Sequence, residues 1–108
     1  MSRELGIKEE GNHLTLSGVL AIDHGQELGE VLSGVIARSQ QVFVSLAEVE
    51  DVDTASLQLL YAARTEALHE NKDFIWTEIS TACGDNAALA GMSRFLGFPE
   101  PTDSSHPE

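Results

Sequence analysis

The most constraining feature of the sequence is residues 41–71, where the hydrophobic pattern changes part-way along. The stretch opens with a short, continuous apolar run at 42–46, which is typical of a strand in the centre of a sheet. An acidic segment at 48–53 follows, and we expect it to form a tight loop. From Thr54 onward, apolar residues recur at helical spacing, namely Leu57, Leu60, Tyr61 and Leu68. This order of strand, turn and helix places the Thr54 hydroxyl at a helix N-terminus, beside the end of a buried strand.

The position predicted for Thr54 affects the stability of a negative charge placed there. A helix N-terminus has unpaired N–H groups and a partial positive charge, so it stabilises an anion such as a phosphate. Asp51 and Asp53 would oppose a phosphate on Thr54, and this balance suits a reversible switch. The same residues are compatible with a second interpretation, in which Asp53 or Thr54 only caps the helix. Both interpretations stay open from these residues alone.

The flanking segments complete an α/β pattern. Strands are expected at 5–9, 13–20, 42–46 and 72–78, with turn residues at 11–12. Helices are expected at 23–38 and 54–71, followed by a loop at 80–84 and a last helix over 87–96 that ends at Gly97. Two short apolar strands joined by a helix form a right-handed, parallel βαβ unit. We expect a mixed sheet of about four strands with helices mainly on one face, which leaves the other face for water or a partner.

Trp76 falls inside the last expected strand, and its side chain has two possible roles. Core packing is the usual role of an aromatic residue at such a position. If the side chain instead faces the uncovered side of the sheet, it would be an anchor for a binding partner. The sequence does not assign the face.

The composition fits one folded domain, expected at residues 1–98, because 108 residues leave room for a single hydrophobic core. Proline and serine residues predict a disordered tail at 99–108. No stretch approaches the roughly 20 apolar residues that span a bilayer, and the N-terminus has no secretory pattern. The single cysteine, Cys83, fits a reducing compartment and is expected to be a small buried residue. We therefore expect a cytoplasmic protein that does not insert into membranes.

Charge and motif content narrow the possible functions further. Eighteen acidic residues against six basic ones give a formal net charge of −12, which disfavours nucleic acid and favours a basic protein partner. The four histidines are scattered, and Asp51 and Asp53 have no legible third ligand, so neither a metal site nor a cofactor is expected. The sequence contains no G-x-S-x-G elbow and no glycine-rich phosphate loop, so we do not expect an enzyme.

The segment at 46–60, LAEVEDVDTASLQLL, resembles the core motif of STAS domains, the bacterial anti-sigma-factor antagonists and their relatives. In that family a strand leads into the pattern D-L-S-x-V-x-x-x-D-S/T-x-G-L. Asp53 matches the motif aspartate, Thr54 the residue that is phosphorylated in switchable members, and Leu57 the apolar residue after the motif glycine. The stretches HLTLSGVLAID and MSRFLGF look like the family's second strand and closing helix. There are two departures, because Ser56 replaces the usual glycine and residues 18–21 lack the acidic pair of the G-E-L-D signature.

The resemblance implies a small STAS-like domain that acts as a non-enzymatic regulatory module. It would bind a protein partner, such as an anti-sigma factor with serine/threonine-kinase character, and phosphorylation at Thr54 would switch the binding. The partner-binding residues implied are Asp51, Asp53, Thr54, Ala55, Ser56 and Gln58.

The alternative is a constitutive accessory subunit of a lipid-transport ABC complex or of a chemotaxis-associated signalling complex, with Thr54 as an interface residue. The D-T-A sequence is closer to such members, and the two departures favour them somewhat. The retained hydroxyl of Thr54 places the regulatory role first. The sequence does not indicate the oligomeric state.

Overall fold

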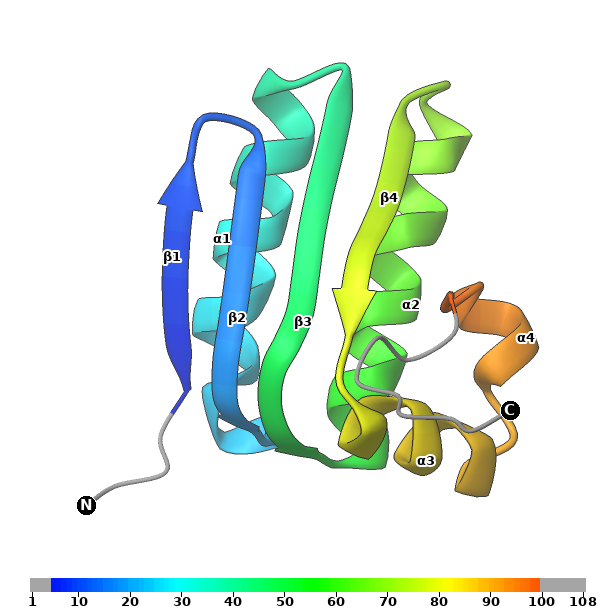
Figure 1. The fold of residues 1–108 in the computed structure, drawn as a ribbon. Helices are drawn as coiled ribbons and strands as arrows, with labels where there is room; N and C mark the ends of the chain where they lie inside the picture. Colours follow the sequence, from blue (N-terminus) through cyan, green and yellow to red (C-terminus); the bar gives the residue numbers. More distant parts are fainter. Residues whose placement is uncertain (1–4, 100–108) are drawn as a thin grey trace.

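The computed structural model describes residues 5–99, which form a four-stranded sheet with helices on one face (Figure 1). The strands are β1 (Gly6–Glu10), β2 (His13–Leu20), β3 (Gln41–Val52) and β4 (Asp73–Ile79). The helices are η1 (Ile22–His24), α1 (Gly25–Arg38), α2 (Thr54–His69), α3 (Thr81–Leu89) and α4 (Ser93–Leu96). Apart from Pro99, the tail expected at 99–108 lies outside the described residues.

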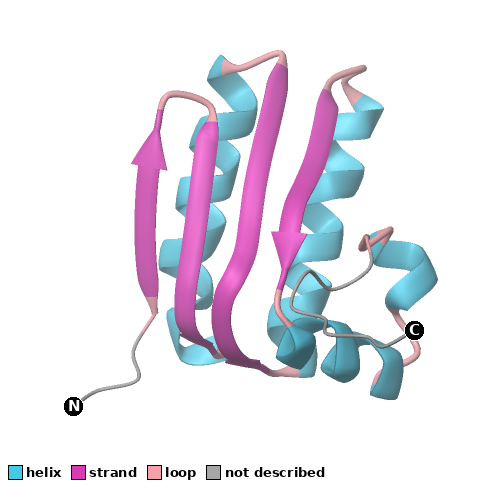
Figure 2. Cartoon of the chain, viewed as in Figure 1, coloured by secondary structure: helices cyan, strands magenta, loops and turns pink. Residues whose placement is uncertain are grey.

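The strands lie in the order β1-β2-β3-β4. The first pair is antiparallel, whereas β2–β3 and β3–β4 are parallel, so the sheet is mixed as predicted. Helices α1 and α2 lie behind the sheet, α3 lies at the lower end of β4 and α4 lies to its right, while the opposite face of the sheet carries no helix (Figure 2). This confirms the α/β fold with helices on one face.

The core lies between the sheet and the helices, and the two-residue period of the strands explains it. Leu14 and Leu16 of β2 and Val42 and Val44 of β3 alternate with partly exposed residues and are fully buried. The expected face of α1 meets them with Leu28, Leu32, Val35 and Ile36. Burying large aliphatic side chains of this kind stabilises the fold by roughly 1.5–3 kcal/mol each.

The acidic segment at 48–53 is not the loop that we expected. It continues β3, which pairs with β2 as far as the Leu20–Val52 pair, and only Asp53 separates the strand from α2. The strict alternation ends here, since the buried residues Leu46, Val49 and Val52 are three apart where the register with β2 shifts, but the acidic residues still occupy exposed positions. The charges that suggested a loop mark the solvent side of a long strand.

The C-terminal helices also differ from the expectation. The segment at 80–84 is not a loop, because the Ser80 hydroxyl accepts a hydrogen bond from the Cys83 N–H at 3.1 Å and so caps α3. The single helix expected at 87–96 is instead two helices, separated at Gly91, where the backbone has a φ of +73°. The expected end at Gly97 is confirmed, and this residue is left-handed.

Trp76 packs in the core and is not a surface anchor. It pairs in register with the buried Val44 and is only 6% exposed. Its ring meets Phe74 and Phe98 edge to face, with ring centroids 4.9 and 5.0 Å away. Its indole N–H donates to the carbonyl of Leu96 at 2.7 Å, which attaches α4 to the sheet.

Cys83 is fully buried near the start of α3, as expected of a small core residue. Burial raises the pKa of the thiol to about 11, and the hydrogen bond with Ser80 offsets this only in part. We therefore expect iodoacetamide to alkylate Cys83 of the native protein at pH 8 far more slowly than it alkylates the protein in guanidinium, since the thiolate is the nucleophile. Mass spectrometry of timed samples measures both rates. Equal rates would contradict the buried, protonated thiol.

Candidate functional site

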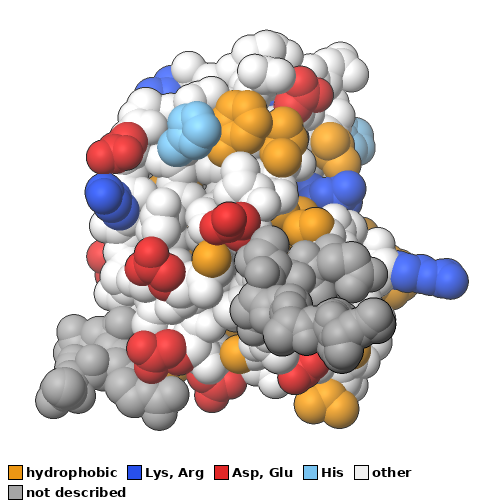
Figure 3. Space-filling model, viewed as in Figure 1, with side chains coloured by type: hydrophobic (Ala, Val, Ile, Leu, Met, Phe, Trp, Pro, Cys, Tyr) orange, Lys and Arg blue, Asp and Glu red, His pale blue; other side chains and the backbone are white. Residues whose placement is uncertain are grey.

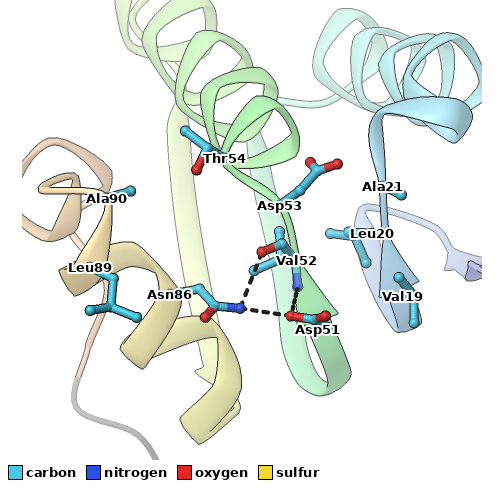
Figure 4. A pocket seen from close by; sticks show the side chains of 10 residues that line it. All are labelled: Val19, Leu20, Ala21, Asp51, Val52, Asp53, Thr54, Asn86, Leu89 and Ala90. Carbon is cyan, nitrogen blue, oxygen red and sulfur yellow. Dashed lines mark hydrogen bonds between the residues drawn. The ribbon is translucent and has the colours of Figure 1, made fainter.

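The ends of β2 and β3 meet the first turn of α2 and one side of α3 at a groove of about 490 Å³ (Figure 4). Residues from β2 and the turn after it form one wall, and α3 forms the other. The lining residues are Val19, Leu20, Ala21, Asp51, Val52, Asp53, Thr54, Asn86, Leu89 and Ala90. Three of the six residues that the sequence singled out, Asp51, Asp53 and Thr54, are thus brought together at the carboxyl ends of two parallel strands, a common place for binding sites.

Thr54 is the first residue of α2, and its side chain is exposed at the groove. Within the described part of the chain, its hydroxyl makes no hydrogen bond. The same holds for the backbone N–H groups of Thr54 and Ala55, whereas those of Ser56 and Leu57 bond to Asp53. The first turn of α2 therefore offers a hydroxyl and two N–H donors to solvent.

Asp53 is the N-cap of α2, so the capping interpretation holds for this residue and leaves Thr54 free. One carboxylate oxygen accepts from the Ser56 N–H at 2.8 Å, and the other accepts from the Ile22 N–H at 3.0 Å. The N–H of Asp53 also donates to the Leu20 carbonyl at 3.1 Å. Partial burial acts to raise the pKa of Asp53, but hydrogen bonding from Ser56 and Ile22 outweighs it, and the pKa is lowered. Asp53 thus ties the end of β2 and the start of η1 to α2.

Asp51 connects β3 to α3. Its Oδ1 accepts a hydrogen bond from the Asn86 side-chain amide at 2.9 Å, and the same amide nitrogen donates to the Val52 carbonyl at 3.1 Å (Figure 4). Asn86 is not among the site residues predicted from the sequence, although a polar amide among the mostly small residues of 82–90 is a signal. This contact fixes one wall of the groove.

The other three predicted contacts lie outside the groove lining. Ser56 is 1% exposed, so its side chain is not accessible to a partner. Ala55 is partly buried, and Gln58 is exposed one turn beyond Thr54. Only Gln58 therefore extends the exposed surface that Thr54 begins.

Gln58 belongs to an exposed stripe along α2, which we call the α2 stripe and define as Thr54, Gln58, Tyr61, Thr65 and Leu68. Leu57 and Leu60 face the core as expected, whereas Tyr61 and Leu68 do not. Tyr61 packs edge to face on the exposed Phe95 of α4, with ring centroids 6.1 Å apart. Large apolar side chains therefore follow Thr54 along the solvent side of α2.

Comparison with known proteins decides the family. The family model described as "Mlab, STAS domain" matches residues 4–97. The chain belongs to the STAS domain family. No curated protein sequence matches it.

Solved structures agree with this STAS fold. An anti-sigma factor antagonist from Mycobacterium paratuberculosis is similar with a TM-score of 0.70 and 18% identity, over 93% of this chain and 87% of the other. The Bacillus cell fate determinant SpoIIAA in its phosphorylated form has a TM-score of 0.62 and 10% identity, over 85% and 87% of the two chains. The unphosphorylated form of the anti-sigma factor antagonist SpoIIAA has a TM-score of 0.60 and 10% identity, over 85% and 84%. At these identities the likeness concerns the fold.

The described residues show neither a metal-binding cluster nor a membrane-spanning helix. Residues 5–99 contain no group of three or more histidine, cysteine or acidic side chains arranged to hold a metal ion. No helix in that part of the chain combines the length and the apolar character that crossing a membrane requires.

Proposed function

We propose that this STAS domain, formed by residues 1–98, is a cytoplasmic, non-enzymatic regulatory module that binds a protein partner, and that phosphorylation of Thr54 controls the binding. The proposal rests on the different roles of two adjacent residues, Asp53 and Thr54, at the start of α2. Asp53 caps the helix, so the neighbouring Thr54 hydroxyl is exposed and has no structural bond in the described residues. A kinase could modify Thr54 without removing a contact that the fold needs.

A phosphate at Thr54 would add a charge of about −1.5 to −2 at the groove. The helix N-terminus favours this charge, while Asp51 and Asp53 oppose it. A partner seated on this surface would have to bury the phosphate, and taking a charged group out of water costs several kcal/mol. A basic group of the partner that pairs with the phosphate recovers only part of this cost, because its own charge also leaves water. Phosphorylation should therefore release the partner, even a basic one, without refolding the domain.

The names of the similar structures support the choice of partner. They include anti-sigma factor antagonists, one of which was solved in both phosphorylated and unphosphorylated forms. We therefore propose an anti-sigma factor with serine/threonine-kinase character as the partner. Nucleic acid and cofactors have no part in the proposed function.

The test compares Thr54→Glu with Thr65→Glu, a matched control on the same exposed stripe, 11 residues further along α2. After the partner has been isolated with wild-type protein, calorimetry measures its affinity for each variant. We expect Thr54→Glu to weaken binding at least ~10-fold, which corresponds to ~1.4 kcal/mol, and Thr65→Glu to have much less effect. Circular dichroism should be unchanged in both. The proposal fails if Thr54→Glu binds like wild type, or if the two variants lose affinity equally.

A second candidate function is a constitutive accessory subunit of a transport or chemotaxis complex. The exposed side chains of Tyr61, Leu68 and Phe95 favour it, because they extend the apolar surface well beyond Thr54. Tyr61 lies seven residues after Thr54, about 10 Å along the helix, and Leu68 lies twice as far. Aromatic residues are enriched at the centres of stable interfaces. In that case Tyr61→Ala should weaken partner binding and Thr54→Glu should not.

A further inference from the structure

The lining of the groove beside Thr54 is part apolar and part polar, and its rim is acidic. Six of its ten lining residues are apolar, namely Val19, Leu20, Ala21, Val52, Leu89 and Ala90. Leu89 is 85% exposed and stands on α3 one turn after Asn86. A volume of about 490 Å³ lies within the roughly 300–1,000 Å³ of ligand-binding pockets. The groove can therefore hold a long side chain together with an apolar neighbour.

The charged carboxylates around the groove are not balanced by nearby lysine or arginine residues in the sequence segments that form it. The segments that meet at this edge, 19–27, 48–58 and 80–90, contain no lysine or arginine, and their acidic residues are Asp23, Glu27, Glu48, Glu50, Asp51, Asp53 and Asp85. Acidic side chains are also visible along the lower edge of the molecule in Figure 3, which is viewed as in Figure 1. Such a field attracts cations and repels acidic surfaces.

Four of the five lysine and arginine side chains among residues 5–99 bond elsewhere, and none of the five forms an ion pair with Asp51. Arg38 bonds to Glu9 and to the Gly11 carbonyl, and Lys72 bonds to the Ile36 carbonyl, at the opposite edge of the sheet. Arg64 donates to the Phe95 carbonyl at 3.3 Å. Asp51 takes its hydrogen bonds from a neutral amide and a backbone N–H, both on Oδ1. No counter-ion among residues 5–99 thus offsets this carboxylate at the groove.

We propose that the groove receives a cationic amphipathic segment of the protein partner. An arginine side chain of that segment would meet the Asp51 carboxylate, and an adjacent apolar side chain would pack against Leu89. The apolar part of the lining and the Asp51 carboxylate, which has no counter-ion among residues 5–99, together favour this occupant over an acidic or a purely apolar one. The inference rests on the proposed function, because the groove and Thr54 belong to one surface, and it adds the chemistry of the partner.

The test uses the full ¹⁵N-labelled chain and three short peptides as probes. These are N-acetyl-Leu-Arg amide, its neutral counterpart in which citrulline replaces arginine, and N-acetyl-Gly-Arg amide. We expect saturable shifts at the amide resonances of Asp51, Thr54, Asn86 and Leu89 with the Leu-Arg peptide. Removing either the charge or the leucine should weaken binding about fivefold.

Variants of the protein test the same two contributions, the charge of Asp51 and the apolar surface of Leu89. Asp51→Asn keeps an acceptor for Asn86 but removes the charge, and Leu89→Ala removes an exposed side chain, so neither should unfold the domain. Each should weaken Leu-Arg binding about fivefold, whereas Glu66→Gln, at an exposed acid of α2 outside the groove, should not. No shifts at the groove, equal shifts with citrulline, or an equal effect of Glu66→Gln would overturn the inference.

The failure of this inference can be distinguished from the failure of the proposed switch at Thr54. If the peptides miss the groove but Thr54→Glu still releases the partner, only the chemistry proposed for the partner is wrong. If the Leu-Arg peptide binds as expected while Thr54→Glu leaves partner affinity unchanged, the groove chemistry stands and the phosphorylation switch falls.

Discussion

Replacing Trp76 with alanine is expected to lower the free energy of unfolding by about 3–5 kcal/mol, the usual range for removing a large aromatic residue from a core. The indole is 6% exposed and makes edge-to-face contacts with Phe74 and Phe98. Its loss would leave a cavity beneath α4 and an unpaired carbonyl at Leu96. For a domain of this size the melting temperature should fall by ~12 °C or more.

Urea denaturation followed by far-ultraviolet circular dichroism measures this loss without using tryptophan fluorescence, since Trp76 is the only tryptophan in the chain. Ile75→Ala is the matched control, because Ile75 is the next residue of β4 and is 38% exposed. We expect that control to cost less than about 1.5 kcal/mol. Trp76→Phe should fall between the two, because it keeps a ring but not the hydrogen-bond donor. Similar losses for Trp76→Ala and Ile75→Ala would show that the indole does not hold the core together.

The same side chain shows how far the sequence could predict the fold. The alternation at 13–20 predicts β2 with its observed bounds, because one face of that strand is buried and the period is regular. Trp76 could not be assigned to a face, since a single aromatic residue is compatible with either side of a strand. Its position depends on α4, whose Leu96 carbonyl accepts the indole hydrogen bond from 20 residues further along the chain.

The errors in the prediction have related physical causes. Acidic residues in the second half of β3 have the composition of a loop, but they occupy the exposed positions of a strand that also buries Val49 and Val52. Gly84, Asp85 and Asn86 weaken the helical pattern of α3, so only the Ser80 cap could have indicated where that helix begins.

The candidate site was predictable in its local part. Asp51, Asp53 and Thr54 are close in sequence, and the strand-to-helix order alone brings them together. Asn86 and Leu89 lie in α3, where the sequence predicted a loop at 80–84 and a helix only from residue 87. Their place at the groove follows from the packing of α3 against β3 and from the Asn86–Asp51 hydrogen bond. Interactions of this kind depend on tertiary structure and leave little trace in a single sequence.

Replacing Asp53 with alanine is expected to cost about 2–3 kcal/mol. Losing an aspartate cap costs about 1 kcal/mol, and losing a second hydrogen bond to a charged group adds about 1.5 kcal/mol. Asp53→Asn should cost less, since an amide oxygen can still accept from Ser56, although the amide has no second oxygen for Ile22. Thr54→Ala, at the adjacent exposed residue, is the control and should change stability by less than about 0.5 kcal/mol.

The contribution of Asp53 should also depend on pH in a defined direction. Its pKa in the folded protein is lowered, so the unfolded chain binds its proton first as the pH falls. The stabilisation is therefore fully present above the unfolded pKa, about 3.9, and disappears as the pH drops through the folded value. Urea denaturation of wild type and Asp53→Asn should show a constant difference from pH 7 to pH 5 and a smaller one near pH 3. A difference that persists unchanged at pH 3 would mean that the carboxylate charge does not strengthen these two hydrogen bonds. The start of α2, and with it the exposure of Thr54, would then depend on contacts other than this cap.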